Sequence, residues 1–148
     1  MTRRTILRRL GIYALLDLLC AAAGMGVPLF CIAFGFLVGW RTVRLLGLAE
    51  QSIGESLARI LLWAGVTSGV TFAIMAAVWG RCLPMLFDPA ADIANFGMPL
   101  ILFEPRASFL AWIALMVVVS PVLQFLVTVF GAHVALLRDV KARVPGIM

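Results

Sequence analysis

The sequence predicts an all-α fold, a small polytopic bundle of four membrane helices that forms one integral membrane domain over residues 1–148. Of its 148 residues, 64% are apolar and only 13% are charged, whereas soluble domains carry about 25% charged residues. A domain of this size has too little interior to hide so many apolar side chains from water. The apolar residues also gather in three blocks, 11–40, 60–80 and 109–137, each long enough to cross a bilayer.

The first apolar block, residues 11–40, is too long for one ordinary membrane helix, which needs about 20 residues. The segment Gly24–Pro28 at its middle places glycine where a helix ends and proline where the next helix begins. We therefore expect a short hairpin that turns at Gly24–Pro28, with helices over about 6–24 and 28–46. The alternative is a single long helix that is kinked at Pro28.

The distribution of Lys and Arg distinguishes these alternatives, because cytoplasmic loops are enriched in basic residues. With a single helix in the first block, the twelve basic residues divide equally between the two sides of the membrane. With a hairpin, ten basic residues face the cytoplasm and only Arg81 and Arg106 face outward. The charge pattern therefore favours the hairpin and predicts both termini in the cytoplasm. The two hairpin helices need not reach the outer surface.

The third helix is expected over residues 53–79. Ser52 and Glu55 have the spacing of a capping box, in which each side chain satisfies a free backbone donor of the other residue. The helix continues through the second apolar block and ends near Trp79, a residue type that prefers the membrane–water interface. Tyr13, Trp40 and Trp63 are expected near the opposite, inner interface on the same grounds.

The outer loop, residues 81–107, contains signals for a short helix of its own. Asp88 and Pro89 are typical of a helix start, and Gly97 is typical of a helix end. We therefore expect a short helix over about 89–96 that lies on the outer membrane interface.

The fourth helix is expected over residues 108–137. Glu104, which precedes Pro105, should have an extended backbone, because the residue before proline avoids the helical region. Pro121 lies near the middle of this helix and is expected to kink it, since proline cannot donate a backbone hydrogen bond and its ring clashes with the preceding turn.

Two pairs of glycines at helical spacing are the clearest packing signal. Gly35 and Gly39 form one GxxxG motif, and Gly65 and Gly69 form another. Small residues let membrane helices approach closely, and close approach drives their association in lipid. These glycines are expected to pack helices within the chain, or to hold a second copy of the chain or a partner subunit.

Asp17 is the most informative single residue, because it lies about 10 Å along its helix from the predicted turn and thus within the apolar slab. A lone carboxylate at that depth costs several kcal/mol unless it is paired, hydrated or protonated. The functional interpretation is an ion or proton site formed by Asp17, Gln124 and Ser120. The structural interpretation is a hydrogen bond to one of several polar residues: Thr67, Ser68, Thr71, Ser120 or Gln124. If the hairpin does not form, Asp17 lies at the inner interface.

The sequence carries no recognisable catalytic or metal-binding motif. Cys20, Cys31 and Cys82 lack ligand spacing, and the single histidine, His133, cannot supply the three or four protein ligands of a zinc site. Cys20 and Cys31 flank the predicted turn at equal depth. They could form a disulfide, although we favour free apolar fillers. The sequence therefore predicts no enzyme activity, metal or cofactor.

The expected function is that of a non-catalytic accessory or scaffold subunit in the cell (plasma or inner) membrane, acting through helix–helix association. The expected partners are the bilayer and a second copy or a membrane partner subunit. Nucleic acid is not expected, because the basic residues flank the apolar blocks and form no continuous stripe. The alternative is a small oligomeric proton- or cation-linked transporter or channel that uses Asp17.

Overall fold

The computed structural model describes residues 3–24, 27–48, 51–95 and 102–143, and these residues contain helices and no strands. The all-α prediction is thus confirmed for the described part of the chain. The four long helical segments are α1 (Arg3–Ala23), α2 (Leu29–Leu46), α3 (Ile53–Trp79) and a final continuous segment. The final segment consists of α4 (Pro105–Ala114), a π-helical turn η4 (Leu115–Val119) and α5 (Ser120–Arg143).

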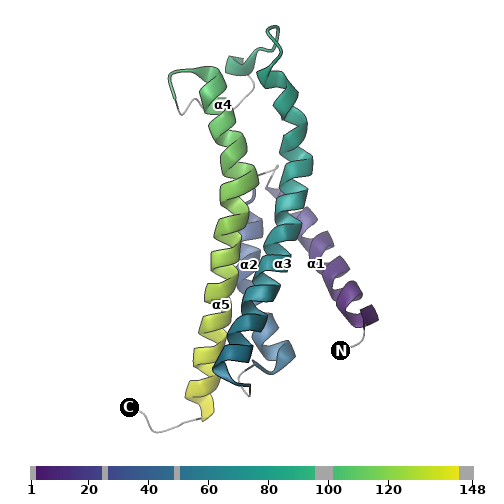
Figure 1. The fold of residues 1–148 in the computed structure, drawn as a ribbon, viewed down its shortest axis with the longest axis vertical. Helices are drawn as coiled ribbons and strands as arrows, with labels where there is room; N and C mark the ends of the chain where they lie inside the picture. Colours follow the sequence, from purple (N-terminus) through teal and green to yellow (C-terminus); the bar gives the residue numbers. More distant parts are fainter. Residues whose placement is uncertain (1–2, 25–26, 49–50, 96–101, 144–148) are drawn as a thin grey trace.

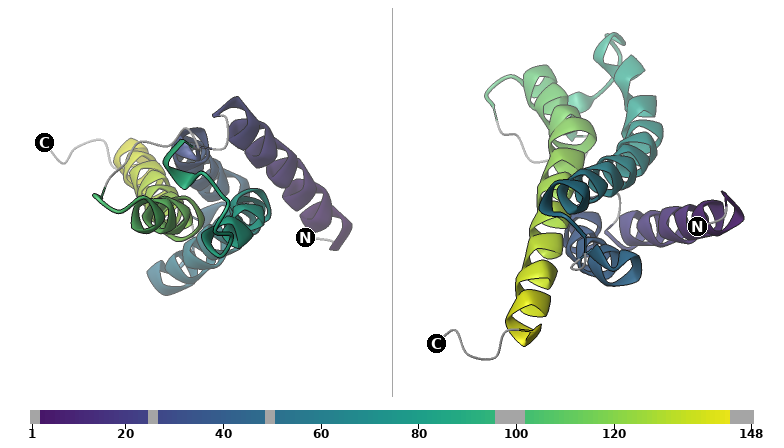
Figure 2. Two further views of the ribbon diagram at one scale, coloured as in Figure 1. Left: turned by 90° about the horizontal axis from the view of Figure 1, so that it is seen from above. Right: turned by 60° about the horizontal axis from the view of Figure 1, so that its bottom comes forward.

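The long helices α3 and α4–α5 run side by side for most of the length of the molecule (Figure 1). Helix α2 packs closely along α5, whereas α1 leans away from the other helices, as both views in Figure 2 show. The α1–α2 connection lies part of the way along α3. Both ends of the chain and the α2–α3 connection lie toward the same end of the bundle (Figure 1).

The first apolar block contains two helices and a turn. Helix α1 ends at Ala23, the amide of Val27 donates to the carbonyl of Gly24 across 2.9 Å, and α2 begins at Leu29. The alternative of a single helix kinked at Pro28 is therefore wrong. Met25 and Gly26, at the centre of the predicted turn, lie outside the described residues.

Three helical segments of the described chain are long and apolar enough to cross a membrane: Leu29–Leu46, Ile53–Leu86 and Pro105–Ala142. Helix α1 is not among them, because it carries four arginines and Asp17 within its 21 residues. These lengths and compositions indicate a membrane protein.

Helix α3 begins at Ile53, as the sequence predicts. Ser52 has an extended backbone, and its hydroxyl accepts a hydrogen bond from the amide of Glu55 at 3.4 Å. This contact satisfies one of the amides that lack a partner at a helix start.

The outer loop differs from its prediction. A 3₁₀ helix, η2 (Gly80–Leu86), continues α3, and the only helix described within residues 89–95 is a 3₁₀ turn, η3 (Ile93–Asn95). The carboxylate of Asp88 accepts from the amide of Ala90 across 2.9 Å. Asp88 thus closes a local turn and does not begin an α-helix. Residue 96 and Gly97, the predicted helix end, lie outside the described residues.

The fourth predicted helix is longer than expected and is interrupted before Pro121. The chain is helical from Pro105, after an extended Glu104 (φ −97°, ψ 119°) whose carboxylate caps the helix start. The amide of Ser120 donates to the carbonyl of Leu115, five residues earlier. The wider turn accommodates Pro121, which lacks a backbone donor.

Candidate functional site

Asp17 lies on the face of α1 that meets α3, and its side chain is fully buried. The hydroxyl of Thr71, itself fully buried on α3, donates a hydrogen bond to Oδ2 of Asp17 across 2.6 Å. The buried Sγ of Cys31 donates to the backbone carbonyl of Asp17 at 3.5 Å. The hairpin and α3 therefore enclose the carboxyl group.

Tyr13, one turn before Asp17, connects α1 to both α3 and α5. Its hydroxyl donates to the carbonyl of Thr67 across 3.2 Å, lies 3.4 Å from the hydroxyl of Thr71, and accepts from Nε2 of Gln124 across 2.6 Å. Four side chains and the backbone carbonyl of Thr67 thus form one buried group from three helices. We call it the polar cluster: Tyr13, Asp17, Thr67, Thr71 and Gln124.

The polar cluster contains two buried oxygens without a hydrogen-bond partner. These are Oδ1 of Asp17 and Oε1 of Gln124. A buried acceptor without a partner costs about 1–3 kcal/mol. A proton on the carboxyl group would turn Oδ1 into a donor, and each of the two oxygens has free lone pairs to offer a small cation. The cluster therefore has the chemistry to hold a proton or a cation.

Of the three residues predicted for an ion or proton site, two lie in the polar cluster. Asp17 and Gln124 are both fully buried there. The hydroxyl of Ser120 donates instead to the carbonyl of Leu115 in its own helix, across 2.8 Å. Its contact supports the π-helical turn that accommodates Pro121.

Tyr13 is the cluster member that the sequence analysis did not assign to the site. The residue is 8% exposed, and its hydroxyl lies inside the bundle. Its position four residues before Asp17, on the same helix face, is the signal that could have identified it.

The remaining candidates for metal or thiol chemistry are dispersed. Cys20, Cys31 and Cys82 are free thiols, so Cys20 and Cys31 form no disulfide in this structure. His133 is exposed, and its Nδ1 lies 2.9 Å from the carbonyl of Val129 in its own helix. Within the described ranges, no three His, Cys, Asp or Glu side chains lie close enough together to hold a metal ion.

The first glycine pair packs α2 against α5. A Cβ atom added to Gly39 would lie 1.9 Å from the backbone oxygen of Thr128, and one added to Gly35 would lie 2.8 Å from its hydroxyl. A third glycine, Gly131 on α5, belongs to the same crossing, because an added Cβ would lie 2.3 Å from the oxygen of Phe36. These glycines are therefore used within the chain.

The second glycine pair faces outward. A Cβ atom added to Gly65 or Gly69 meets nothing within 4 Å, and both residues are exposed. Ala73 and Ala77 follow at the same four-residue spacing and are also exposed. We call these four residues the open face of α3. Ala73 and Ala77 also line a shallow apolar groove of about 460 Å³ between α1 and α3.

Comparison of the chain with protein-family models, with curated proteins and with solved structures gave no match.

Proposed function

We propose that this chain is a non-catalytic membrane scaffold or accessory subunit that acts through helix–helix association, with a second copy of the chain as its partner at the open face of α3. The observation that carries the proposal is the contrast between the two glycine pairs. Helix α5 packs directly against Gly35 and Gly39, whereas the space beside Gly65 and Gly69, where a neighbouring helix would lie, is open.

A second copy fits this face because a ridge of small residues is complementary to itself. Gly65, Gly69, Ala73 and Ala77 follow one row at four-residue spacing, and such rows let two membrane helices cross closely at about −40°. In a two-fold dimer the same face of each copy would contact the other. The adjoining groove between α1 and α3, lined by Leu15, Leu18 and other apolar residues, would receive side chains from the partner helix.

The proposed setting is the cell membrane, with four membrane helices and both termini in the cytoplasm. The basic residues support this setting. The helix segments at the end of the bundle that holds both termini (Figure 1) carry Arg8, Arg9, Arg41, Arg44, Arg59, Arg138 and Lys141. The segments at the other end carry Arg81 and Arg106. From Leu10 to Ala23, α1 offers only about 21 Å of uninterrupted helix beyond its arginines. The α1–α2 hairpin would therefore enter from the cytoplasmic side and end within the bilayer.

The experiment is to count copies of the fluorescently labelled chain in bilayers at low protein density by single-molecule photobleaching. The wild-type chain should bleach in two steps. The double variant Gly65→Leu/Gly69→Leu should bleach in one step, because the leucines fill the open face. The matched control is Gly11→Leu on α1, which is also exposed with nothing within 4 Å of an added Cβ, and it should keep two steps.

Two results would overturn the proposal of self-association. The wild-type chain could bleach in one step at every density, which would leave the open face to a different subunit. Alternatively, the Gly11→Leu control could lose the second bleaching step as fully as the double variant does. The loss would then follow from any glycine-to-leucine change in a helix and not from filling the open face.

A second candidate function is a proton- or cation-linked transporter or channel that uses Asp17. One observation favours it, namely the two unpartnered oxygens of Asp17 and Gln124 in the centre of the bundle. Proteoliposomes should then carry a proton or monovalent-cation flux that Asp17→Asn abolishes while the helical content stays unchanged. Wild-type vesicles without flux would exclude this function.

A further inference from the structure

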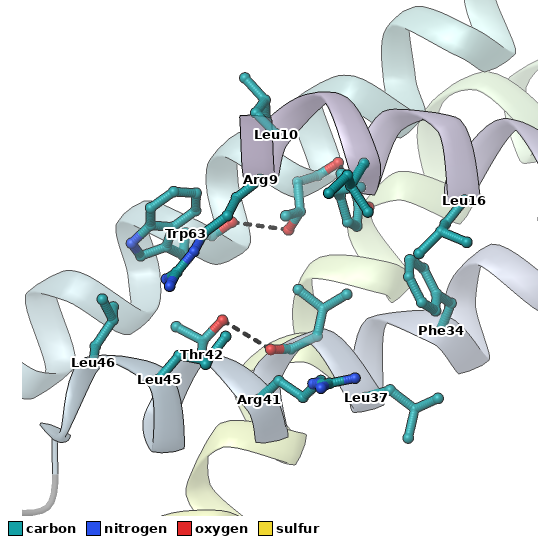
Figure 3. A pocket seen from close by; sticks show the side chains of 14 residues that line it. Arg9, Leu10, Leu16, Phe34, Leu37, Arg41, Thr42, Leu45, Leu46 and Trp63 are labelled. Atoms are coloured by element: carbon teal, nitrogen blue, oxygen red, sulfur yellow. Dashed lines mark hydrogen bonds between the residues drawn. The ribbon is translucent and has the colours of Figure 1, made fainter. Parts of the chain in front are cut away.

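A pocket of about 490 Å³ lies where α1 diverges from α2 (Figure 3). At the end toward the α1–α2 turn, the rings of Tyr13 and Phe34 stack with centroids 5.7 Å apart and close the space between the two helices. Toward the ends of the helices that carry the arginines, the helices separate and the pocket opens. The pocket is thus a wedge with an apolar closed end.

The walls of the pocket are apolar except for two cationic side chains. Arg9 extends from α1 toward Trp63, and Arg41 lies on the facing wall formed by α2 (Figure 3). No Asp or Glu occurs among the described residues that line the pocket. The lining therefore combines two positive charges with aliphatic and aromatic side chains, among them Leu16 and Leu37.

This combination matches the two parts of an anionic phospholipid. Arginine donates paired hydrogen bonds to phosphate oxygens, and basic pockets between membrane helices on the cytoplasmic side bind anionic headgroups. The apolar walls would take an acyl chain, and the volume lies in the range of small-molecule sites, about 300–1,000 Å³.

We propose that the wedge between α1 and α2 is a binding site for one anionic phospholipid, with its phosphate between Arg9 and Arg41 and one acyl chain running along Leu37 toward Phe34. The site shares no lining residue with the groove beside the open face of α3. The proposal therefore stands whether or not the chain forms a dimer.

The test is native mass spectrometry of the full chain released from vesicles of equal parts dioleoyl phosphatidylglycerol and dioleoyl phosphatidylcholine. Phosphatidylglycerol should be retained about twenty-fivefold over phosphatidylcholine, since each arginine contributes about fivefold. Arg9→Gln/Arg41→Gln should bring the ratio close to one. The matched control, Arg59→Gln/Lys141→Gln, removes two exposed cations that do not line the pocket and should keep the wild-type ratio.

A second variant tests the apolar part of the site with the charges intact. Thr42→Trp should fill the pocket, which Thr42 lines, and abolish retained lipid while Arg9 and Arg41 remain. Millimolar inorganic phosphate should not displace the lipid from the wild-type chain. Equal retention of the two lipids by the wild-type chain, equal effects of the two charge variants, undiminished retention by Thr42→Trp, or displacement by phosphate would each overturn the proposal.

Discussion

Thr71 on α3 donates a hydrogen bond to the carboxylate of Asp17 on α1 across 2.6 Å, and both side chains are fully buried. The contact matters because α1 leans away from the bundle and shares little surface with it (Figure 2). Together with Tyr13, this pair holds α1 to the two long helices. The polar cluster is thus a structural attachment in addition to a candidate ion or proton site.

The Asp17–Thr71 pair makes an asymmetric prediction for unfolding. Thr71→Val should lower the free energy of unfolding by about 1–3 kcal/mol, because the carboxylate then lacks a partner in a dry site. In an Asp17→Leu background the same substitution should lower the free energy of unfolding by about 1 kcal/mol less, since no carboxylate is left without a hydrogen-bond partner. Chemical unfolding in micelles, followed by circular dichroism, measures both. Equal costs in the two backgrounds would show that the pair is not coupled.

The Tyr13 hydroxyl should contribute measurably to the attachment of α1. Tyr13→Phe removes the acceptor of Gln124 Nε2 and the donor to Thr67, and we expect a loss of about 1 kcal/mol in the free energy of unfolding. Hydrogen exchange of the α1 amides should accelerate more than that of α5. The prediction is contradicted if all helices exchange faster by the same factor.

The α2–α5 crossing should not tolerate one added methyl group. Gly39→Ala places a Cβ against the backbone of Thr128, so the helices must separate, at a cost of about 1–3 kcal/mol or more. Gly54→Ala, at a site with nothing within 4 Å of an added Cβ, is the control and should leave the melting temperature unchanged. An unchanged melting temperature for Gly39→Ala would mean that α2 and α5 cross less closely.

The π-helical turn should tolerate a deletion that the neighbouring helix does not. A π turn holds one more residue than an α turn. Deletion of the exposed Val118 together with Pro121→Ala should therefore leave α4 and α5 packed on their neighbours through the same residues as now. Deletion of Leu126 with the same proline substitution should rotate the rest of α5 by about 100° and prevent folding. Helical content and monodispersity after purification distinguish the two variants. Equal folding would be inconsistent with a local π turn.

The proposed orientation can be tested with a membrane-impermeant maleimide on intact cells. In a Cys20→Ala background, Cys82 should react from outside the cell. With Cys82→Ala and Ala142→Cys added to that background, the new thiol on the exposed part of α5 should react only after the cells are permeabilised. Labelling of residue 142 in intact cells would show that the C-terminal end of α5 lies outside the cell and would contradict the proposed orientation.

Local signals in the sequence were sufficient to predict the helices. The glycine and proline of Gly24–Pro28 separate α1 from α2, and the hydroxyl of Ser52 caps α3, because both effects depend on residues close together in the chain. Asp88 and Pro89 misled the prediction of a helix over 89–96. The same aspartate can cap a helix or close a turn, and the choice depends on the residues that follow.

Contacts between distant helices could not be predicted from local patterns. The two GxxxG pairs are equivalent in sequence, and only the packing of α5 onto Gly35 and Gly39 separates their roles. The cost of burying a carboxylate in an apolar segment predicted Asp17 as a site residue, and Gln124 was one of its candidate partners. Tyr13 shares the helix face of Asp17, but the contact of this face with Thr67 and Gln124 depends on the rotation of α1 about its axis, which no local pattern specifies.

The long sequence separation within the polar cluster implies an order of biogenesis. Thr71 follows Asp17 by 54 residues, and Gln124 follows Tyr13 by 111. At a synthesis rate of about 5–20 residues per second, the ribosome needs several seconds or more after Tyr13 before its last partner exists. The contacts of Tyr13 are therefore complete only after α5 is made, and until Thr71 exists the carboxylate of Asp17 must be sheltered by water, headgroups or the insertion machinery.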